Sequence, residues 1–315
     1  MAPAVSHPGP PCRLHDVETT DPNAEELLAR AFEDDRPRLL RVAYTMTGSL
    51  VEAEDCVQEA WLRLRGVDDP ASIRELGAWL TTTVSRLALD TLTSARARRE
   101  KYVGTWLPEP LVETPSADPA DRITLDESVS MALLVVLERL SPAERTAFVL
   151  HDVFGVPFPE VAEVVGRSPA AVRQLASRAR RHVQDGRPRT PATEAEQREL
   201  VGAFTAACRN GDLPGLIALL DPDVVIRGDG GGKVRTLQHI ERGAARVASM
   251  VLAAYARMAG PLDTLPTEVN GAPGLLVRDA GGGLGVMAFT VDAGRITAIN
   301  IVRNPDKLAM VPDLL

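Results

Sequence analysis

The sequence lacks the features of secreted, membrane-spanning and zinc-binding proteins. It has only three cysteines, Cys12, Cys56 and Cys208, and no two of them are close together. This spacing excludes a disulfide framework and a CxxC zinc site, so we expect a cytoplasmic protein without a bound metal. No apolar run approaches the roughly 18 residues of a membrane span. The first residues have neither the basic nor the apolar part of a secretory signal, so we expect no such signal.

A net positive charge is also missing, because the formal net charge of the 315 residues is −8. A chain of this charge does not coat nucleic acid generally, but DNA binding depends on where the basic residues lie. Seven arginines and one acid lie between Arg167 and Arg189. A shorter basic run consists of Arg96, Arg98, Arg99 and Lys101. The length predicts two or three domains of roughly 150 residues each.

Helix-capping patterns and proline-rich stretches divide the chain into segments. Asn23, Ser49, Ser72 and Ser141 are each followed three residues later by glutamate, the capping-box pattern of a helix start. About four helices are therefore expected in the first bundle. Prolines interrupt the helical periodicity twice, which predicts linkers. The expected segments are a flexible tail (1–22), a helical bundle (23–100), a flexible linker (101–125), a second helical domain (126–184), a linker (185–193) and a C-terminal domain (194–315).

The C-terminal segment has a mixed pattern. Two helical stretches precede a short strand at 224–226, and an alanine-rich helix is expected at about 238–259. Alternating runs punctuated by glycine then predict four strands, at 265–270, 274–278, 284–291 and 295–302. A long helix beside a late antiparallel meander is typical of an α+β domain.

The helix expected at 50–65 has two stripes. One stripe is apolar, includes Val57 and Trp61, and is expected to be buried. The other consists of Asp55, Gln58, Glu59 and Leu62. A solvated face explains the acidic residues, whereas Leu62 among them favours a docking surface for a partner helix.

The helix expected at about 72–95 carries Trp79, Thr83, Arg86 and Asp90 on an outward stripe. A tryptophan among small polar residues can stack on an unpaired base. A partly buried core tryptophan explains the same periodicity equally well, so both interpretations stay open.

Residues 157–183 have the pattern of a helix-turn-helix. A helix at 159–165 is ended by Gly166, Ser168 is the expected N-cap of the next helix, and Pro169 takes its first position. The outward residues of that second helix are Arg173, Gln174, Ser177, Arg178 and Arg181. Such a helix enters the major groove, where Arg and Gln pair with guanine and adenine. A solvated basic helix explains less, because the turn, the cap and the first helix all agree.

Three segments in this order resemble the extracytoplasmic-function (group IV) sigma factors of bacterial RNA polymerase. EAEDCVQEAWLRL (52–64) is similar to the family's polymerase-clamp-binding helix. GAWLTTTVSRLALDTLTSARAR (77–98) is similar to the helix that melts and reads the minus-ten element. LSPAERTAFVLHDVFGVPFPEVAEVVGRSPAAVRQLASRARRHV (140–183) is similar to the domain that reads the minus-thirty-five element. The resemblance implies two all-α domains, sigma region 2 and sigma region 4.

The resemblance also implies partners and roles. The partners would be promoter DNA and core RNA polymerase, contacted through its flap and the clamp helices of its largest subunit. The clamp would bind Asp55, Gln58, Glu59 and Leu62. The melted minus-ten strand would contact Trp79, Thr82, Thr83 and Arg86. The minus-thirty-five element would contact Arg173, Gln174, Ser177, Arg178 and Arg181. No GxxxxGK[ST] loop for ATP is present, so melting would use binding energy alone.

Residues 194–315 are similar to the SnoaL-like, cone-shaped α+β domain that is fused to one group of these sigma factors. Three short segments support this similarity. They are WLPEP (Trp106, Leu107, Pro108, Glu109, Pro110), DGGGK (Asp229, Gly230, Gly231, Gly232, Lys233) and NPDKL (Asn304, Pro305, Asp306, Lys307, Leu308). That group lacks a separate anti-sigma factor, which implies that the fused domain controls activity through these segments. The sign of the control stays open.

SnoaL-like domains also suit small-molecule enzymes, which gives an alternative. The pocket candidates would be His239, Asp229, Arg227 and Asp212. A surface or capping role for His239 is simpler, and Lys233 lacks the following Ser or Thr of a phosphate loop. We therefore expect no catalysis and no cofactor, and the alternative is a bifunctional protein whose SnoaL-like domain binds or turns over a small molecule. A ligand-controlled helix-turn-helix repressor would leave residues 25–100 unexplained.

Overall fold

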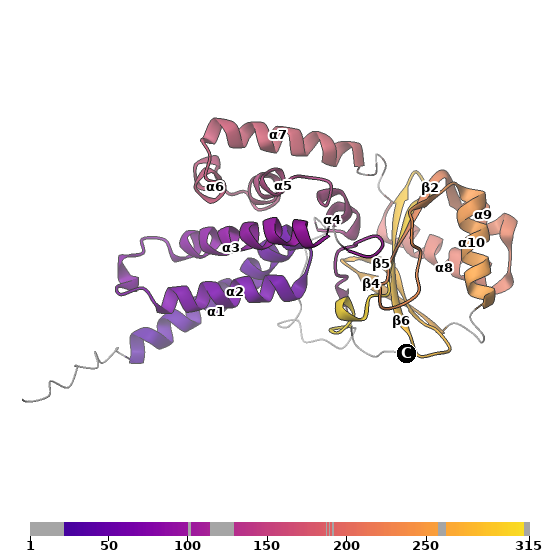
Figure 1. Cartoon of the computed structure of the whole chain (residues 1–315), viewed down its shortest axis with the longest axis horizontal. Helices are drawn as coiled ribbons and strands as arrows, with labels where there is room; N and C mark the ends of the chain where they lie inside the picture. The colour runs from indigo at the N-terminus through magenta and orange to yellow at the C-terminus, as the bar shows by residue number, and fades with distance from the viewer. Residues whose placement is uncertain are drawn as a thin grey trace, which may run out of the picture.

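Helices form one end of the molecule and a β-sheet with its own helices forms the other (Figure 1). The computed structural model describes residues 22–99, 102–113, 129–186, 188, 190, 192–257 and 263–311. The expected tail up to residue 21, residues 114–125 of the expected linker and the side chains of the basic run at 96–101 lie outside the described residues. Among the described residues, no helix is long and apolar enough to cross a membrane.

The N-terminal bundle has fewer helices than the capping patterns predict. Residues 22–99 form α1 (Pro22–Thr47), α2 (Leu50–Arg65), the 3-10 turn η1 (Pro70–Ser72) and α3 (Leu76–Arg99). Ser49 caps α2 as predicted, because its hydroxyl accepts the Glu52 amide at 3.4 Å. Ser72 does not cap α3. It ends η1, where its hydroxyl donates to the carbonyl of Asp69, and α3 begins only at Leu76.

The second helical domain consists of helices with clear capping residues. Its elements are α4 (Met131–Leu137), α5 (Pro142–Phe148), the π-helical turn η2 (Val149–Val153), α6 (Phe158–Val165) and α7 (Pro169–Gly186). Ser141 and Glu144 form a full capping box on α5. Gly166 ends α6 with a left-handed φ of 67°, and the Ser168 hydroxyl accepts the Ala171 amide at the start of α7. The predicted helix-turn-helix is confirmed.

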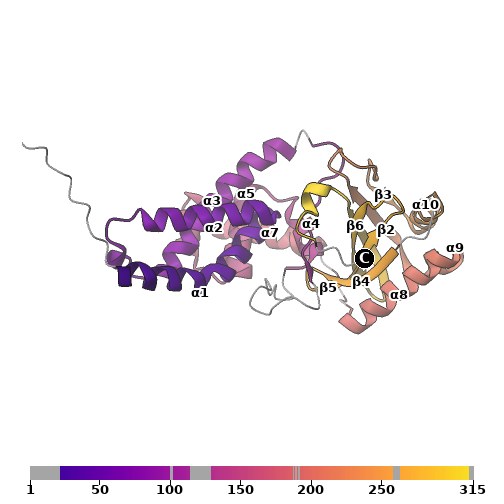
Figure 2. The same ribbon diagram turned by 90° about the horizontal axis from the view of Figure 1, so that it is seen from below.

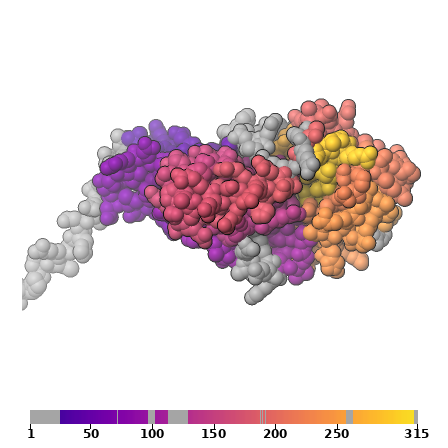
Figure 3. Space-filling view, turned by 90° about the horizontal axis from the view of Figure 1, so that it is seen from above, coloured from indigo at the N-terminus to yellow at the C-terminus, as the bar shows by residue number. Residues whose placement is uncertain are grey.

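The two helical domains share one hydrophobic core. Val84 of α3, Phe148 of α5 and Val161 of α6 are buried in a single cluster, and α3 contacts both α5 and α6. Figure 3 shows the second domain, in rose, lying over the purple N-terminal helices. The sequence patterns predict two helical domains but not that they pack against each other.

The C-terminal domain is the predicted α+β fold. Its helices are α8 (Glu194–Asn210), α9 (Leu213–Leu219) and α10 (Ala244–Arg257). Its strands are β2 (Leu220–Asp229), β3 (Glu241–Arg242), β4 (Asp263–Val269), β5 (Ala272–Arg278), β6 (Leu284–Asp292) and β7 (Arg295–Val302). The helix expected at 238–259 starts later, because the chain from Gly230 to Gly243 forms turns and β3.

The sheet order in the described residues is β1-β4-β5-β6-β7-β2-β3, where β1 is Val112–Glu113 from the expected linker. Its neighbouring strands are antiparallel, except that β2 runs parallel to β7. The helices α8, α9 and α10 pack on one face, where Val224 and Phe289 are buried (Figures 1 and 2). The opposite face is covered by linker residue Leu107 and by Met131 of α4. Residues 102–113 are therefore fixed by the C-terminal domain, and the flexible linker expected here is wrong for this part.

Candidate nucleic-acid and polymerase interfaces

The outward face of α7 gathers the five residues expected at the minus-thirty-five element. Arg173, Gln174, Ser177, Arg178 and Arg181 are all exposed. They face outward because Val172, Leu175 and Ala176 on the opposite stripe are buried. The Arg173 guanidinium lies 5.6 Å from the centre of the Phe158 ring of α6. Arg180, also in α7, is held away from this outward face by an ion pair of 2.5 Å with Asp152.

The residues expected at the minus-ten element lie on α3, beside α6. Trp79 is half-buried against the shared core, and Thr82 and Thr83 are also half-buried. Arg86 is exposed, and its guanidinium donates to the carbonyl of Glu163 at 3.2 Å. Glu163 belongs to α6 of the second helical domain. The α3 face and the helix-turn-helix therefore contact each other in this arrangement.

The residues expected at the polymerase clamp form one face of α2. Asp55, Gln58 and Leu62 are exposed. Leu62 is 53% exposed. Glu59 is half-buried and pairs with Arg63 at 2.9 Å. The face is free of the bundle core, whose α2 residues include Val57 and Leu64.

A buried arginine joins the two helical domains. Arg145 of α5 is only 1% exposed. Its guanidinium donates to the carbonyl of Thr45 in α1 at 3.1 and 3.3 Å and also pairs with Glu138. Because a buried guanidinium needs hydrogen-bond partners, separating α5 from α1 leaves this charge without its backbone acceptors.

The three short segments expected at the interdomain junction meet around Asp229. Asp229 is fully buried, and its carboxylate accepts the Leu107 amide at 2.9 Å and the Tyr102 hydroxyl at 2.6 Å. Lys307 pairs with the same carboxylate at 2.7 Å and also donates to the Leu107 carbonyl. The Lys307 ammonium lies 3.9 Å from the Trp106 ring centre, a cation–π contact. WLPEP, DGGGK and NPDKL thus contribute to one buried cluster.

The remaining residues of these segments shape the same cluster. Asn304 donates to the Tyr102 hydroxyl at 2.9 Å. A side chain at Gly231 would collide with Asn304, since a Cβ would lie 2.5 Å from the Asn304 Cγ. Lys233 and Asp306 form an exposed ion pair of 2.7 Å within the C-terminal domain. Of the others, Leu308, Pro108, Pro110 and Gly230 are buried, and Gly232 and Pro305 are exposed.

Glu109 connects the junction to α2, the helix that carries Leu62. Its carboxylate accepts the Leu50 amide at 2.8 Å and the Ser49 hydroxyl at 3.1 Å, at the start of α2. Burial raises the pKa of Glu109, although these hydrogen bonds and the charge of Lys307 oppose the shift. The carbonyl of Glu109 accepts the Tyr44 hydroxyl of α1 at 2.7 Å.

The four candidates for a catalytic pocket do not come together. Asp212 caps α9 by accepting the Gly215 amide at 2.9 Å, and His239 is exposed before β3 rather than at a helix start. Asp229 is engaged by the linker, whereas Arg227 lies two residues away on β2, beside Asn300. The sequence patterns missed Tyr44, Tyr102, Arg145 and Asn270.

Two family models match the helical part of the chain. Residues 31–98 match the family model of sigma-70 region 2, and residues 130–183 match that of sigma-70, region 4. The ECF RNA polymerase sigma factor SigJ of Mycobacterium tuberculosis is 44% identical over 293 residues, which cover 89% of this chain and 93% of SigJ. The probable ECF RNA polymerase sigma factor SigI of the same organism is 38% identical over 89% of this chain and 94% of its own.

A solved structure extends the similarity to the C-terminal domain. The crystal structure of the Mycobacterium tuberculosis extracytoplasmic function sigma factor SigJ aligns with a TM-score of 0.73 at 40% sequence identity. The alignment covers 89% of this chain and 98% of that one. The match therefore includes the helical domains, the junction and the sheet.

Proposed function

The chain belongs to the extracytoplasmic-function (ECF) RNA polymerase sigma factors, and we propose that its C-terminal domain holds it in an inactive, closed arrangement. In its active form it recruits core RNA polymerase through the α2 face around Leu62 and through the flap. It opens the minus-ten element with the α3 face around Trp79, and it reads the minus-thirty-five element with α7.

One observation carries the proposed closed state, the contact of α3 with α6 through Arg86 and Glu163. Packed helices lie about 8–10 Å apart, so α3 and α7, with α6 between them, are separated by roughly 20 Å. The two promoter elements are centred about 25 base pairs apart, or about 85 Å at roughly 3.4 Å per base pair. The α3 face and α7 are therefore too close together to contact both promoter elements at once. Promoter binding requires the two helical domains to separate.

The C-terminal domain is placed to oppose that separation. It binds linker residues 102–113 through Asp229 and β1, and the linker in turn contacts α1 and α2 through Glu109. Moving a two-state equilibrium from 99:1 to 1:99 requires about 5.5 kcal/mol. Removing one partner of a buried ion pair costs about 3–5 kcal/mol. Loss of the Asp229 cluster would therefore remove a large part of the free energy that favours the closed state over the open one. In this proposal no separate anti-sigma factor is needed.

Transcription assays test the sign of the control. Run-off transcription with core polymerase, on promoters selected from a random library, compares the full chain with a chain that ends before residue 190. We expect the shorter chain to give more transcript. Loss of transcription with unchanged polymerase binding would mean that the C-terminal domain builds the active form. Equal transcript from the two chains would remove the domain from the control altogether.

A further inference from the structure

A cavity of about 200 Å³ lies between the second helical domain and the sheet. Its walls come from α4 and the end of α7 on one side and from β2, β6 and β7 on the other. The strand residues that line it, such as Val225 and Thr290, alternate with residues buried under α8, α9 and α10. The cavity therefore lies on the sheet face opposite those helices, and it exists only while α4 is docked.

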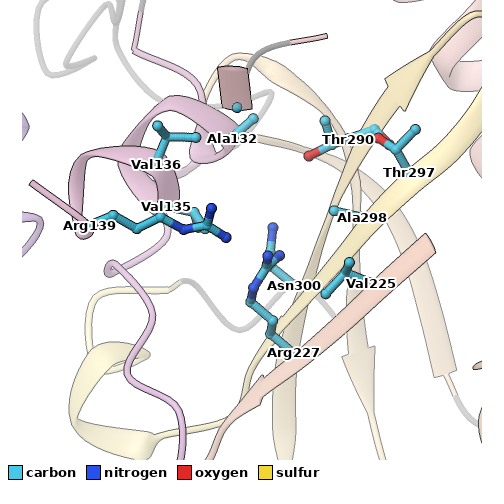
Figure 4. A pocket seen from close by; sticks show the side chains of 11 residues that line it. Ala132, Val135, Val136, Arg139, Val225, Arg227, Thr290, Thr297, Ala298 and Asn300 are labelled. Carbon is cyan, nitrogen blue, oxygen red and sulfur yellow. The ribbon is translucent and has the colours of Figure 1, made fainter. Parts of the chain in front are cut away.

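Two arginines point into this cavity. Figure 4 shows the side chains of Arg139, at the end of α4, and Arg227, on β2, directed into the space between α4 and the sheet. Arg227 is only 8% exposed, and its guanidinium donates to Asn300 Oδ1 at 3.3 Å. Within the part of the chain that the structure describes, no Asp or Glu forms an ion pair with Arg139 or Arg227.

A buried guanidinium such as that of Arg227 is unfavourable without a negative partner. Burial, together with the charges of Arg139 and Arg242, lowers the pKa of Arg227 to about 10. The group nevertheless stays protonated at neutral pH, so it occupies the interior as a cation. Buried charges are normally paired, and guanidinium groups pair with oxyanions through two parallel hydrogen bonds. The buried Arg227, with Arg139 beside it, therefore favours an anion in this cavity.

The other residues that line the cavity indicate what the rest of such an anion would look like. Val135, Val136, Val225 and Ala298 give apolar surface, and Thr290 and Thr297 add hydroxyl groups. An engineered cavity of about 150 Å³ accepts benzene in another protein, so a space of this size holds a ring or a short chain with one acidic group.

We propose that this cavity binds a small organic oxyanion, a carboxylate or a phosphate ester, whose acidic group lies between Arg139 and Arg227 and whose apolar part lies against the valines. The ligand would contact the second helical domain and the sheet simultaneously. A ligand that binds only the docked arrangement shifts the population towards it. This regulatory effect rests on the closed state proposed above, whereas binding itself does not.

Binding is tested on the full chain with three probes at constant ionic strength. The probes are sodium benzoate, its neutral analogue benzamide, and inorganic phosphate, measured by calorimetry and by thermal unfolding. We expect benzoate to bind at millimolar concentrations and to raise the unfolding temperature, and benzamide to do neither. Phosphate binding as tight as that of benzoate would assign the site to the oxyanion alone and overturn the apolar part of the proposal.

Matched variants locate the site. Arg139→Gln should weaken benzoate binding roughly tenfold, because it removes one of two charged partners. Arg139 is exposed, so this variant should fold even if Arg227→Gln does not. Arg242→Gln is the control, since Arg242 lies near Arg227 but outside the cavity lining and is exposed. Equal weakening in Arg139→Gln and Arg242→Gln, or no benzoate binding at all, would overturn the site.

A transcription arm separates the two proposals. Benzoate should lower run-off transcription by the wild-type chain and leave that of Arg139→Gln unchanged. Benzoate binding that weakens in Arg139→Gln, without any change in transcription, would support the anion site and overturn the closed-state control. Repression that is equal in the wild type and Arg139→Gln would show that benzoate acts elsewhere.

Discussion

The side chain of Asn270 donates a hydrogen bond of 2.8 Å to the hydroxyl of Tyr44. Tyr44 lies in α1 and Asn270 in the turn between β4 and β5, and the two are 0% and 2% exposed. The same hydroxyl donates to the Glu109 carbonyl, while the Asn270 side chain accepts the Leu111 amide at 3.2 Å. One buried tyrosine thus connects the N-terminal bundle, the linker and the C-terminal domain.

Tyr44→Phe should loosen this connection without opening a cavity. It leaves the Glu109 carbonyl and the Asn270 amide without their partner, which costs about 1–3 kcal/mol for a buried group. We expect a lower free energy of unfolding, measured by urea denaturation, and more run-off transcript. Tyr255→Phe, which removes a hydroxyl from α10 within the C-terminal domain, is the matched control. Unchanged transcript in Tyr44→Phe would contradict a role of this contact in the closed state.

Asp229→Asn should destabilise the junction by about 3–5 kcal/mol, because it removes the carboxylate charge that pairs with the largely buried Lys307 ammonium. The double variant Asp229→Asn/Lys307→Met should recover part of this loss. Lys233→Met breaks an exposed pair instead and should cost about 0–1 kcal/mol. Thermal unfolding of the wild type, Asp229→Asn, Lys307→Met and the double variant gives the coupling energy of the pair. Additive effects of the two buried substitutions would argue against it.

Leu62→Ala should leave stability nearly unchanged, as surface substitutions usually do. Binding to core RNA polymerase, measured by co-purification, should fall sharply. Leu64→Ala is the control, because Leu64 is fully buried and its truncation should cost about 2–5 kcal/mol. A fall in the unfolding temperature of Leu62→Ala as large as that of Leu64→Ala would mean that Leu62 belongs to the core.

Arg178→Ala should weaken binding to the minus-thirty-five element. A base contact should cost roughly 1–3 kcal/mol at a single base pair, whereas a phosphate contact should weaken all sequences evenly and reduce the salt dependence. Fluorescence anisotropy with duplexes that differ at one position distinguishes these outcomes. Arg180→Ala serves as the control, because Arg180 is paired with Asp152. Wild-type affinity in both Arg173→Ala and Arg178→Ala would contradict the assignment of this face.

The junction should become less stable as the pH rises above about 4.3, the ordinary pKa of glutamate. The raised pKa of Glu109 means that the folded protein keeps this proton to a higher pH than the unfolded chain does. Between the two pKa values the folded state binds more protons, so the free energy of unfolding falls with increasing pH. Glu109→Gln should lack this contribution, and Glu59→Gln should retain it. A wild-type and a Glu109→Gln protein with parallel pH profiles would contradict the prediction.

The helices and their faces were predictable because they depend on local patterns. The left-handed Gly166, the cap at Ser168 and the buried stripe of α7 all follow from neighbouring residues. The start of α3 was predicted wrongly, because Ser72 ends the 3-10 turn η1 and three further residues separate it from Leu76, where α3 begins. A capping pattern shows that a residue is able to cap a helix but not where the helix begins.

The packing between domains was not predictable in the same way. Glu109 stands between two prolines, a pattern typical of an exposed linker, yet it is buried. Its partners at Ser49, Leu50 and Tyr44 lie about 60 residues away in the sequence, so no local period indicates them. The segments WLPEP, DGGGK and NPDKL were found only by family resemblance, and their meeting point at Asp229 required the fold.

The short strand β1 has a consequence for the opened molecule. It pairs with β4 through Val112 and Val269 at one edge of the sheet, and it comes from the linker rather than from the C-terminal domain. Withdrawal of the linker therefore bares the outer backbone of β4, and unpaired edges readily accept a strand from another chain. If the linker withdraws on activation, we expect the opened form to self-associate as its concentration rises, through the β4 edge that β1 covers in this arrangement.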